Sequence, residues 1–283
     1  MNRGAIRGLL WLGFVVTALM ISAGSYRLLR SGAVLPAASG APALPAAVLL
    51  LIAYVVMLWF SARNVADYPK GALMRTAWWL IAAAATAGLA RIAFECIAAG
   101  SPGLLPWIGL RQIPNVLHSA LILSGALTMW TAFSRLGMGA RFRWPHRVAI
   151  AAILAWMPVV YSVRDHLPDS HSALAFIRVL QASDPFFILA GAVAAVMLLS
   201  IRQEIGRSEM GLSVGFLVAY SILKPLAFGA RALFAARYPV LSAVLAGLAR
   251  SCDWSLALAV FCRWKVTERS RAFVDEYNRG KRR

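Results

Sequence analysis

The sequence predicts an all-α membrane protein, a polytopic transmembrane helix bundle of about eight spans joined by short loops. Of the 283 residues, 60% are hydrophobic and only 14% are charged. Ordinary soluble domains have roughly 45–50% apolar and about 25% charged residues. The apolar residues form repeated stretches of about 20 residues, which is long enough to cross a ~30 Å hydrocarbon core. The stretches are apolar on every face, as lipid-embedded helices must be, because only a helix satisfies its own backbone groups there.

We expect one helix from each of eight such stretches. In chain order the predicted spans are 8–24, 44–62, 76–99, 115–134, 147–163, 185–201, 210–230 and 240–262. The first stretch has a second interpretation, because Arg3, Arg7, a short apolar run and the small residues at 22–24 are also typical of a secretory signal peptide. Cleavage at that point would leave seven spans.

The segment 101–114 between the third and fourth spans is rich in proline. It contains Pro102, Pro106 and Pro114. Proline lacks the N–H that a helix interior needs and clashes with the preceding turn. We therefore expect a loop or a shallow re-entrant segment here.

The chain divides into a transmembrane domain, residues 1–262, and a basic C-terminal helix or tail, residues 263–283. Oppositely charged residues at helical spacing, such as Glu268 and Arg271, favour a continuation of the last helix. A cluster of Lys and Arg next to a span is attracted to anionic lipid. We expect membrane lipids as partners, with anionic lipid at the tail. The alternative to anionic lipid at the tail is a membrane or cytoplasmic protein that binds the same helix.

The distribution of Lys and Arg predicts the orientation. With the amino terminus inside, nineteen basic residues lie on the inner side and seven on the outer side. The inner ones are Arg3, Arg7, Arg63, Lys70, Arg75, Arg135, Arg141, Arg143, Arg147, Arg202, Arg207 and eight in the tail. The outer ones are Arg27, Arg30, Arg111, Arg164, Arg178, Arg231 and Arg237. The positive-inside bias therefore predicts an integral protein of the cell (inner) membrane with both termini in the cytoplasm.

Composition and motifs exclude several classes of function. The formal net charge of +18 arises from residues between spans and in the tail, so we interpret it as a topology signal and expect no nucleic-acid partner. Cys96, Cys252 and Cys262 show no metal-ligand spacing, and we expect neither a metal nor another cofactor. Signatures of serine hydrolases, zinc proteases, phosphate-binding loops and membrane haem are absent, which favours a non-enzymatic protein.

Ionisable residues inside the spans are the candidates for function, because charge at membrane depth is costly. They are Arg91, Glu95, Lys224, Arg250 and Asp253, with His118 as a further polar residue. Arg91 and Glu95 lie four residues apart, and Arg250 and Asp253 three apart, so each pair can neutralise itself along one helix. In that interpretation the two buried ion pairs only hold helices together.

Depth gives the same residues a second interpretation. At 1.5 Å per residue, Arg91, Glu95, His118 and Lys224 share the outer half of the bilayer. Pro225 should break the helix after Lys224, and Tyr220 can then satisfy a freed carbonyl. If these faces converge, the ligand-binding residues are Arg91, Glu95, His118, Tyr220 and Lys224, and the two cations suit an anionic group.

These observations favour a non-enzymatic, sensor-like module that binds a small or lipid-like ligand in the outer half of the bilayer and passes its state to a partner. The layout is similar to the membrane-embedded sensor regions of bacterial signalling proteins, in architecture and not in any motif. A small-solute transporter and a structural or assembly subunit of a larger membrane complex are the alternatives. An intramembrane enzyme is least favoured.

The charge bias gives a test of topology. We expect Ala175, in the loop between the fifth and sixth predicted spans, to lie outside the cytoplasm. Reporter fusions after Ala175 and cysteine labelling from either side of the membrane measure this directly. A cytoplasmic Ala175 would contradict the predicted arrangement.

Overall fold

The computed structural model describes residues 3–30, 44–100, 105–138, 190–206, 208–234 and 238–281. All regular elements within these residues are helices, which confirms the predicted all-α class. They are α1 (Arg3–Arg30), α3 (Leu44–Ala66), α4 (Leu73–Gly100), α5 (Leu105–Arg135), α8 (Glu209–Phe234) and α9 (Pro239–Lys281). A further helical stretch covers 190–205.

Five of the described helices contain segments long and apolar enough to cross a membrane, which identifies a helical membrane protein. These segments are Ala5–Arg27, Pro45–Ala66, Leu73–Phe94, Pro114–Arg135 and Pro239–Trp264. They correspond to five of the predicted spans, and α8 covers the predicted span at 210–230. The predicted span at 147–163 lies outside the described residues and that at 185–201 lies partly outside them. The count of about eight therefore stays a prediction.

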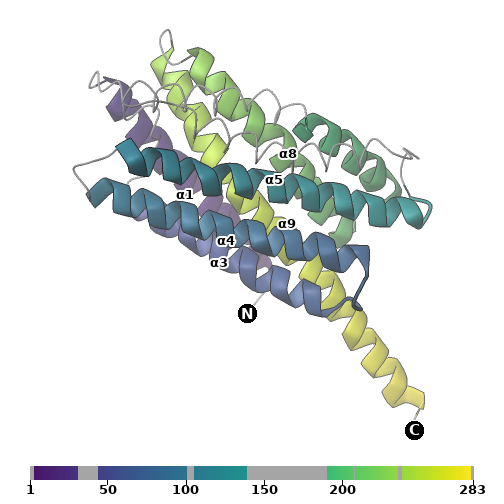
Figure 1. Ribbon diagram of the computed structural model, residues 1–283. Coiled ribbons are helices and arrows are strands. Elements are labelled where there is room, and N and C mark those ends of the chain that lie inside the picture. The colour runs from purple at the N-terminus through teal and green to yellow at the C-terminus, as the bar shows by residue number, and fades with distance from the viewer. Residues whose placement is uncertain are drawn as a thin grey trace.

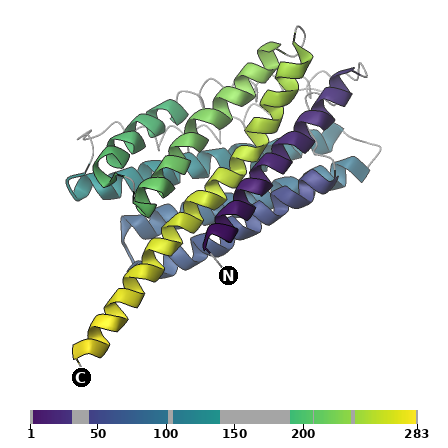
Figure 2. The same ribbon diagram turned by 180° about the vertical axis from the view of Figure 1, so that it is seen from behind.

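The described helices form two layers (Figures 1 and 2). In one layer α4 lies between α3 and α5; in the other α9 lies between α1 and α8. The layers meet mainly where α9 packs against α3. Helix α9 thus occupies the centre of its own layer and also faces the opposite one.

Close contact between helices depends on glycine at two places. A Cβ on Gly247 of α9 would overlap the backbone of α1 at Ala18, so the absence of a side chain lets α1 lie directly against α9. A Cβ on Gly88 of α4 would overlap the ring of Tyr54. Gly88 thereby leaves room for Tyr54 of α3 to reach into the space between the layers.

The proline-rich segment differs from its prediction. Residues 101–104 lie outside the described part, but α5 begins at Leu105 and continues through Pro114. Pro106 lies in the first turn, where backbone N–H groups have no partner inside the helix in any case. Pro114 costs one helical hydrogen bond without ending the helix. The predicted loop or re-entrant segment is therefore wrong from Leu105 onward.

The two ends of the bundle differ. At one end, which we call the extension end, α1 begins, α3 turns into α4, α8 begins, and α9 leaves the bundle as a protruding helix (Figures 1 and 2). Several interactions of basic residues gather here. Arg7 forms an ion pair of 2.6 Å with Glu209, and Arg263 donates to the hydroxyl of Tyr68 in the α3–α4 turn. Helix α9 continues beyond Trp264 to Lys281, about 25 Å at 1.5 Å per residue.

Candidate functional site

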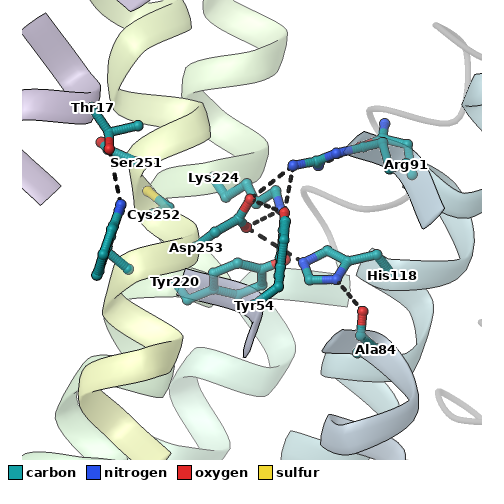
Figure 3. A network of polar contacts seen from close by, with 12 residues as sticks. Thr17, Tyr54, Ala84, Arg91, His118, Tyr220, Lys224, Ser251, Cys252 and Asp253 are labelled. Carbon is teal, nitrogen blue, oxygen red and sulfur yellow. Dashed lines mark hydrogen bonds and ion pairs between the residues drawn. The ribbon is translucent and has the colours of Figure 1, made fainter. Parts of the chain in front are cut away.

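A fully buried carboxylate, that of Asp253 on α9, lies between the two layers (Figure 3). Its Oδ1 lies 2.6 Å from Nζ of Lys224 on α8. Its Oδ2 lies 3.0 Å from a terminal guanidinium nitrogen (Nη2) of Arg91 on α4. One anion is therefore shared by two cations from two other helices.

Two tyrosines complete the hydrogen bonding of these charges. The hydroxyl of Tyr54 on α3 donates to Asp253 Oδ2 and accepts from Arg91 Nη2. The hydroxyl of Tyr220 on α8 accepts from Lys224 Nζ at 2.9 Å. Both cations also lie near the corresponding rings, Arg91 at 5.5 Å from the Tyr54 centroid and Lys224 at 4.7 Å from that of Tyr220. Such contacts offset part of the cost of burying a cation.

Helix α5 contributes a histidine and an amide. His118 Nδ1 lies 2.7 Å from the carbonyl oxygen of Ala84, and Nε2 lies 3.4 Å from Asp253 Oδ1. Asn115, one helical turn earlier, accepts a hydrogen bond of 3.0 Å from Arg91 Nη1. The spacing of three residues places both side chains on the same face of α5.

We call this set the Asp253 cluster. It consists of Tyr54, Arg91, Asn115, His118, Tyr220, Lys224 and Asp253. The members come from α3, α4, α5, α8 and α9, so five helices meet at one carboxylate. Arg91, His118 and Asp253 are 0% exposed and Lys224 is 3% exposed. Charges so deeply buried persist only when they are paired and hydrogen-bonded, which every charged member of the cluster is.

The cluster brings together four of the five residues predicted to bind a ligand, namely Arg91, His118, Tyr220 and Lys224. The side chain of the fifth, Glu95, lies outside the described residues, so its predicted pairing with Arg91 stays a prediction. Asp253 has partners across the bundle that its spacing from Arg250 did not indicate, while Arg250 itself is buried one turn earlier on α9. The predicted Arg250–Asp253 pair, like ligand binding itself, is a prediction that these contacts do not test.

Sequence reasoning missed Tyr54 and Asn115. Tyr54 lies in the middle of an apolar span with no charged neighbour, and a tyrosine in such a span packs as an ordinary apolar side chain in most cases. Asn115 follows Pro114 in the segment that was predicted to be irregular. Its spacing of three residues from His118 was the only available signal, and it has meaning only if the segment is a helix.

An apolar groove lies between α3, α4 and α5. Its volume is about 590 Å³, and its lining includes Leu58, Trp79, Thr86, Ala90, Phe94 and Leu117. The one hydroxyl in the lining, that of Thr86, donates to the carbonyl of Ala82, so the groove offers hydrocarbon contacts. From Trp79 to Phe94 it follows α4 for about 22 Å. Ala90 and Leu117 directly precede Arg91 and His118 in the sequence, so the groove and the cluster adjoin the same two helices.

A second, smaller pocket lies on the other side of α9. It has a volume of about 250 Å³ and lies between α1, α8, α9 and the stretch 190–205. Trp11, Phe14 and Phe216 form an aromatic wall, and Cys252 and Ser255 line it from α9. Within the described parts of the chain, no group of three or more His, Cys, Asp or Glu side chains could hold a metal ion.

Comparison with known proteins adds no assignment. The chain matches no protein-family model, no curated protein and no solved structure. Inference about its function therefore depends on the chemistry of the Asp253 cluster.

The cluster predicts a large effect of removing its anion. We expect Asp253→Asn to lower the free energy of unfolding by about 3–5 kcal/mol, because Arg91 and Lys224 would stay buried without their shared carboxylate. The double variant Asp253→Asn/Lys224→Gln should recover part of this loss, since it removes one of the stranded cations. Reversible unfolding in mixed micelles measures both.

Glu209→Gln is the matched control for this experiment. It breaks the Arg7–Glu209 pair, whose side chains are 37% and 20% exposed, so we expect a loss of about 0–1 kcal/mol. Equal losses for Asp253→Asn and Glu209→Gln would contradict the role given to the cluster.

Proposed function

We propose that this chain is a non-enzymatic, sensor-like module of the cell (inner) membrane, with both termini in the cytoplasm. In this proposal a small or lipid-like ligand with an anionic group binds in the outer half of the bilayer, at Arg91 and Lys224. Binding changes the contacts of Asp253 and thereby the position of α9. The C-terminal part of α9 passes this change to a partner.

The observation that carries the proposal is the sharing of one carboxylate by cations from two helices. Arg91 and Lys224 hold Asp253 from α4 and α8, at 3.0 Å and 2.6 Å. A carboxylate or phosphate group of a ligand has the same chemistry as the Asp253 side chain and can compete for the same donors. Such an exchange would release α9 from α4 and α8. The ligand would then bind the released state of the bundle more tightly than the state in which Asp253 holds the cations, and would shift the equilibrium toward the released state.

The apolar groove supports a lipid-like ligand. Its lining suits a hydrocarbon chain, and its length of about 22 Å along α4 exceeds the roughly 15 Å of one leaflet, half of a ~30 Å core. The groove lies along α4 and α5, the two helices that carry Arg91 and His118, so a chain bound there would contact both helices.

Helix α9 supports the output step. It is continuous from Pro239 to Lys281, so Asp253 and the protruding extension belong to one rigid element. The extension leaves the bundle where Arg263 binds the hydroxyl of Tyr68. Its basic composition suits binding to anionic lipid of the inner leaflet, and a cytoplasmic or membrane protein can bind the same helix.

Matched amphiphiles test the ligand class. The full chain in nanodiscs of uncharged lipid is titrated with a long-chain fatty acid and with the alcohol of the same chain length. We expect the fatty acid to bind and to raise the thermal unfolding midpoint, with the alcohol binding at least tenfold more weakly because it lacks the charge. Lys224→Gln and Arg91→Gln should each weaken fatty-acid binding about tenfold or more, equivalent to 1.4 kcal/mol.

Glu209→Gln should bind the fatty acid like the wild-type chain, because it alters an ion pair at the extension end. Equal binding of acid and alcohol, or equal binding by wild type and the cluster variants, would overturn the proposal. The cluster would then act as a connection between helices, as expected for a structural subunit. Energised uptake of the fatty acid into vesicles would instead favour the transporter.

A further inference from the structure

One imidazole nitrogen of the buried His118 has no hydrogen-bond partner within the part of the chain that the structure describes. Its Nδ1 lies 2.7 Å from the carbonyl oxygen of Ala84. A carbonyl oxygen only accepts, so Nδ1 must carry a proton and donate. The tautomer is thereby fixed, and the second nitrogen, Nε2, has a lone pair whenever the ring is neutral.

Among the described residues, no donor forms a hydrogen bond with this lone pair. Nε2 is buried and has no hydrogen-bond partner among the described residues. Asp253 Oδ1, which lies 3.4 Å from Nε2, is itself an acceptor. Two acceptors that face each other in a dry site repel, and a proton on Nε2 turns this repulsion into a charge-assisted hydrogen bond.

The ring cannot easily turn away from this contact. Tyr54 packs edge-on against it from α3, at a centroid distance of 5.4 Å, and Tyr220 from α8 at 6.2 Å. The hydrogen bond to Ala84 on α4 fixes the remaining side. The charged and titratable groups around the ring, from every helix that contributes to the cluster, are Tyr54, Arg91, Tyr220, Lys224 and Asp253.

We propose that His118 is a proton-binding site. Nε2 takes up a proton, keeps it, and donates a hydrogen bond to Asp253 Oδ1. One N–H bond forms as the Nε2 lone pair takes a proton from hydronium, whose O–H bond breaks and which leaves as water, and no covalent bond within the protein breaks. Oδ1 then accepts from both His118 and Lys224. These two cations repel each other, so protonation weakens the hold of Lys224 on Asp253 and adds one positive charge to the cluster.

The weaker Lys224–Asp253 contact and the added charge link the proton to the proposed ligand site. Only this link rests on the proposed function; the proton site itself does not. Protonated His118 makes the cluster more attractive to an anionic ligand and frees Lys224 to bind it. The effect is present at low pH and disappears as the pH rises and the proton leaves. Through protonation of His118, a low pH outside the cytoplasm would therefore favour the ligand-bound state.

The test follows the proton itself, without any ligand. The full chain, labelled with ¹⁵N-histidine and held in nanodiscs of uncharged lipid, is examined by NMR from about pH 4 to about pH 9, a range that brackets the ordinary titration of histidine near ~6.5. We expect one histidine to show the neutral Nδ1–H form at high pH and protons on both nitrogens at low pH. This signal should vanish in His118→Gln.

Two further measurements connect the proton to Asp253. In wild-type protein, the infrared carboxylate bands that vanish in Asp253→Glu should shift with the same pH midpoint as the His118 signal. In Asp253→Asn, if it folds, the His118 signal should stay in the neutral form to a lower pH, because the acceptor has lost its charge. His118 with an unprotonated Nε2 over the whole range, or with protons on both nitrogens throughout, would overturn the proposal.

Failure of the proton site and failure of the proposed function are separable. A titrating His118 in a chain that binds acid and alcohol amphiphiles equally would keep the proton site and refute the ligand. Selective fatty-acid binding with a His118 that never titrates would do the reverse.

Discussion

The arrangement of the bundle depends on the need to neutralise one buried carboxylate. Asp253 lies on the central helix of one layer, where α9 faces the other layer, and its side chain is fully buried. An ionised carboxylate in such a place is stable only with cations and donors around it. Arg91 and Lys224 provide the charge, and Tyr54 donates a hydrogen bond. Since each donor belongs to a different helix, satisfying this one group also fixes how α3, α4, α8 and α9 lie against one another.

The same constraint gives α9 a distinctive position. Along most of its length it packs on neighbours through apolar contacts, which tolerate small shifts and rotations. At Asp253 the contacts are directional, because a hydrogen bond weakens steeply with angle and distance. The contacts of Asp253 with three other helices therefore restrict the position of α9 at this level. In the proposed function, a change of proton or anion at this point alters the position of α9, including the extension that leaves the bundle near Tyr68.

Much of the helical architecture could be predicted from the sequence, because the length of each apolar segment and the distribution of charge are local properties. They predicted the all-α class, five segments that match apolar helices, and a shared depth for Arg91, His118 and Lys224. Periodicity places a residue at a depth and on a face of its own helix, but it does not determine how the helices are rotated against each other. For this reason spacing suggested Arg250 as the partner of Asp253, while the contacts with Arg91 and Lys224 on two other helices were not foreseen. The course of α5 through Pro114 was missed because proline predicts the loss of one hydrogen bond, whereas the packing of the whole helix decides whether it continues.

The most direct test of this account is the distance between the extension of α9 and the α3–α4 turn, measured by pulsed electron paramagnetic resonance between spin labels at Tyr277 and Lys70. Exposed Cys96 is replaced by Ser, while buried Cys252 and Cys262 stay. We expect one narrow distance distribution in the wild-type background and a shifted or broadened one in folded Asp253→Asn. Trp254→Phe, which removes the buried hydrogen bond of Trp254 to Thr17 on α1 and leaves the Asp253 contacts in place, should keep the wild-type distribution. An unchanged distribution in folded Asp253→Asn would contradict the claim that the Asp253 cluster sets the position of α9.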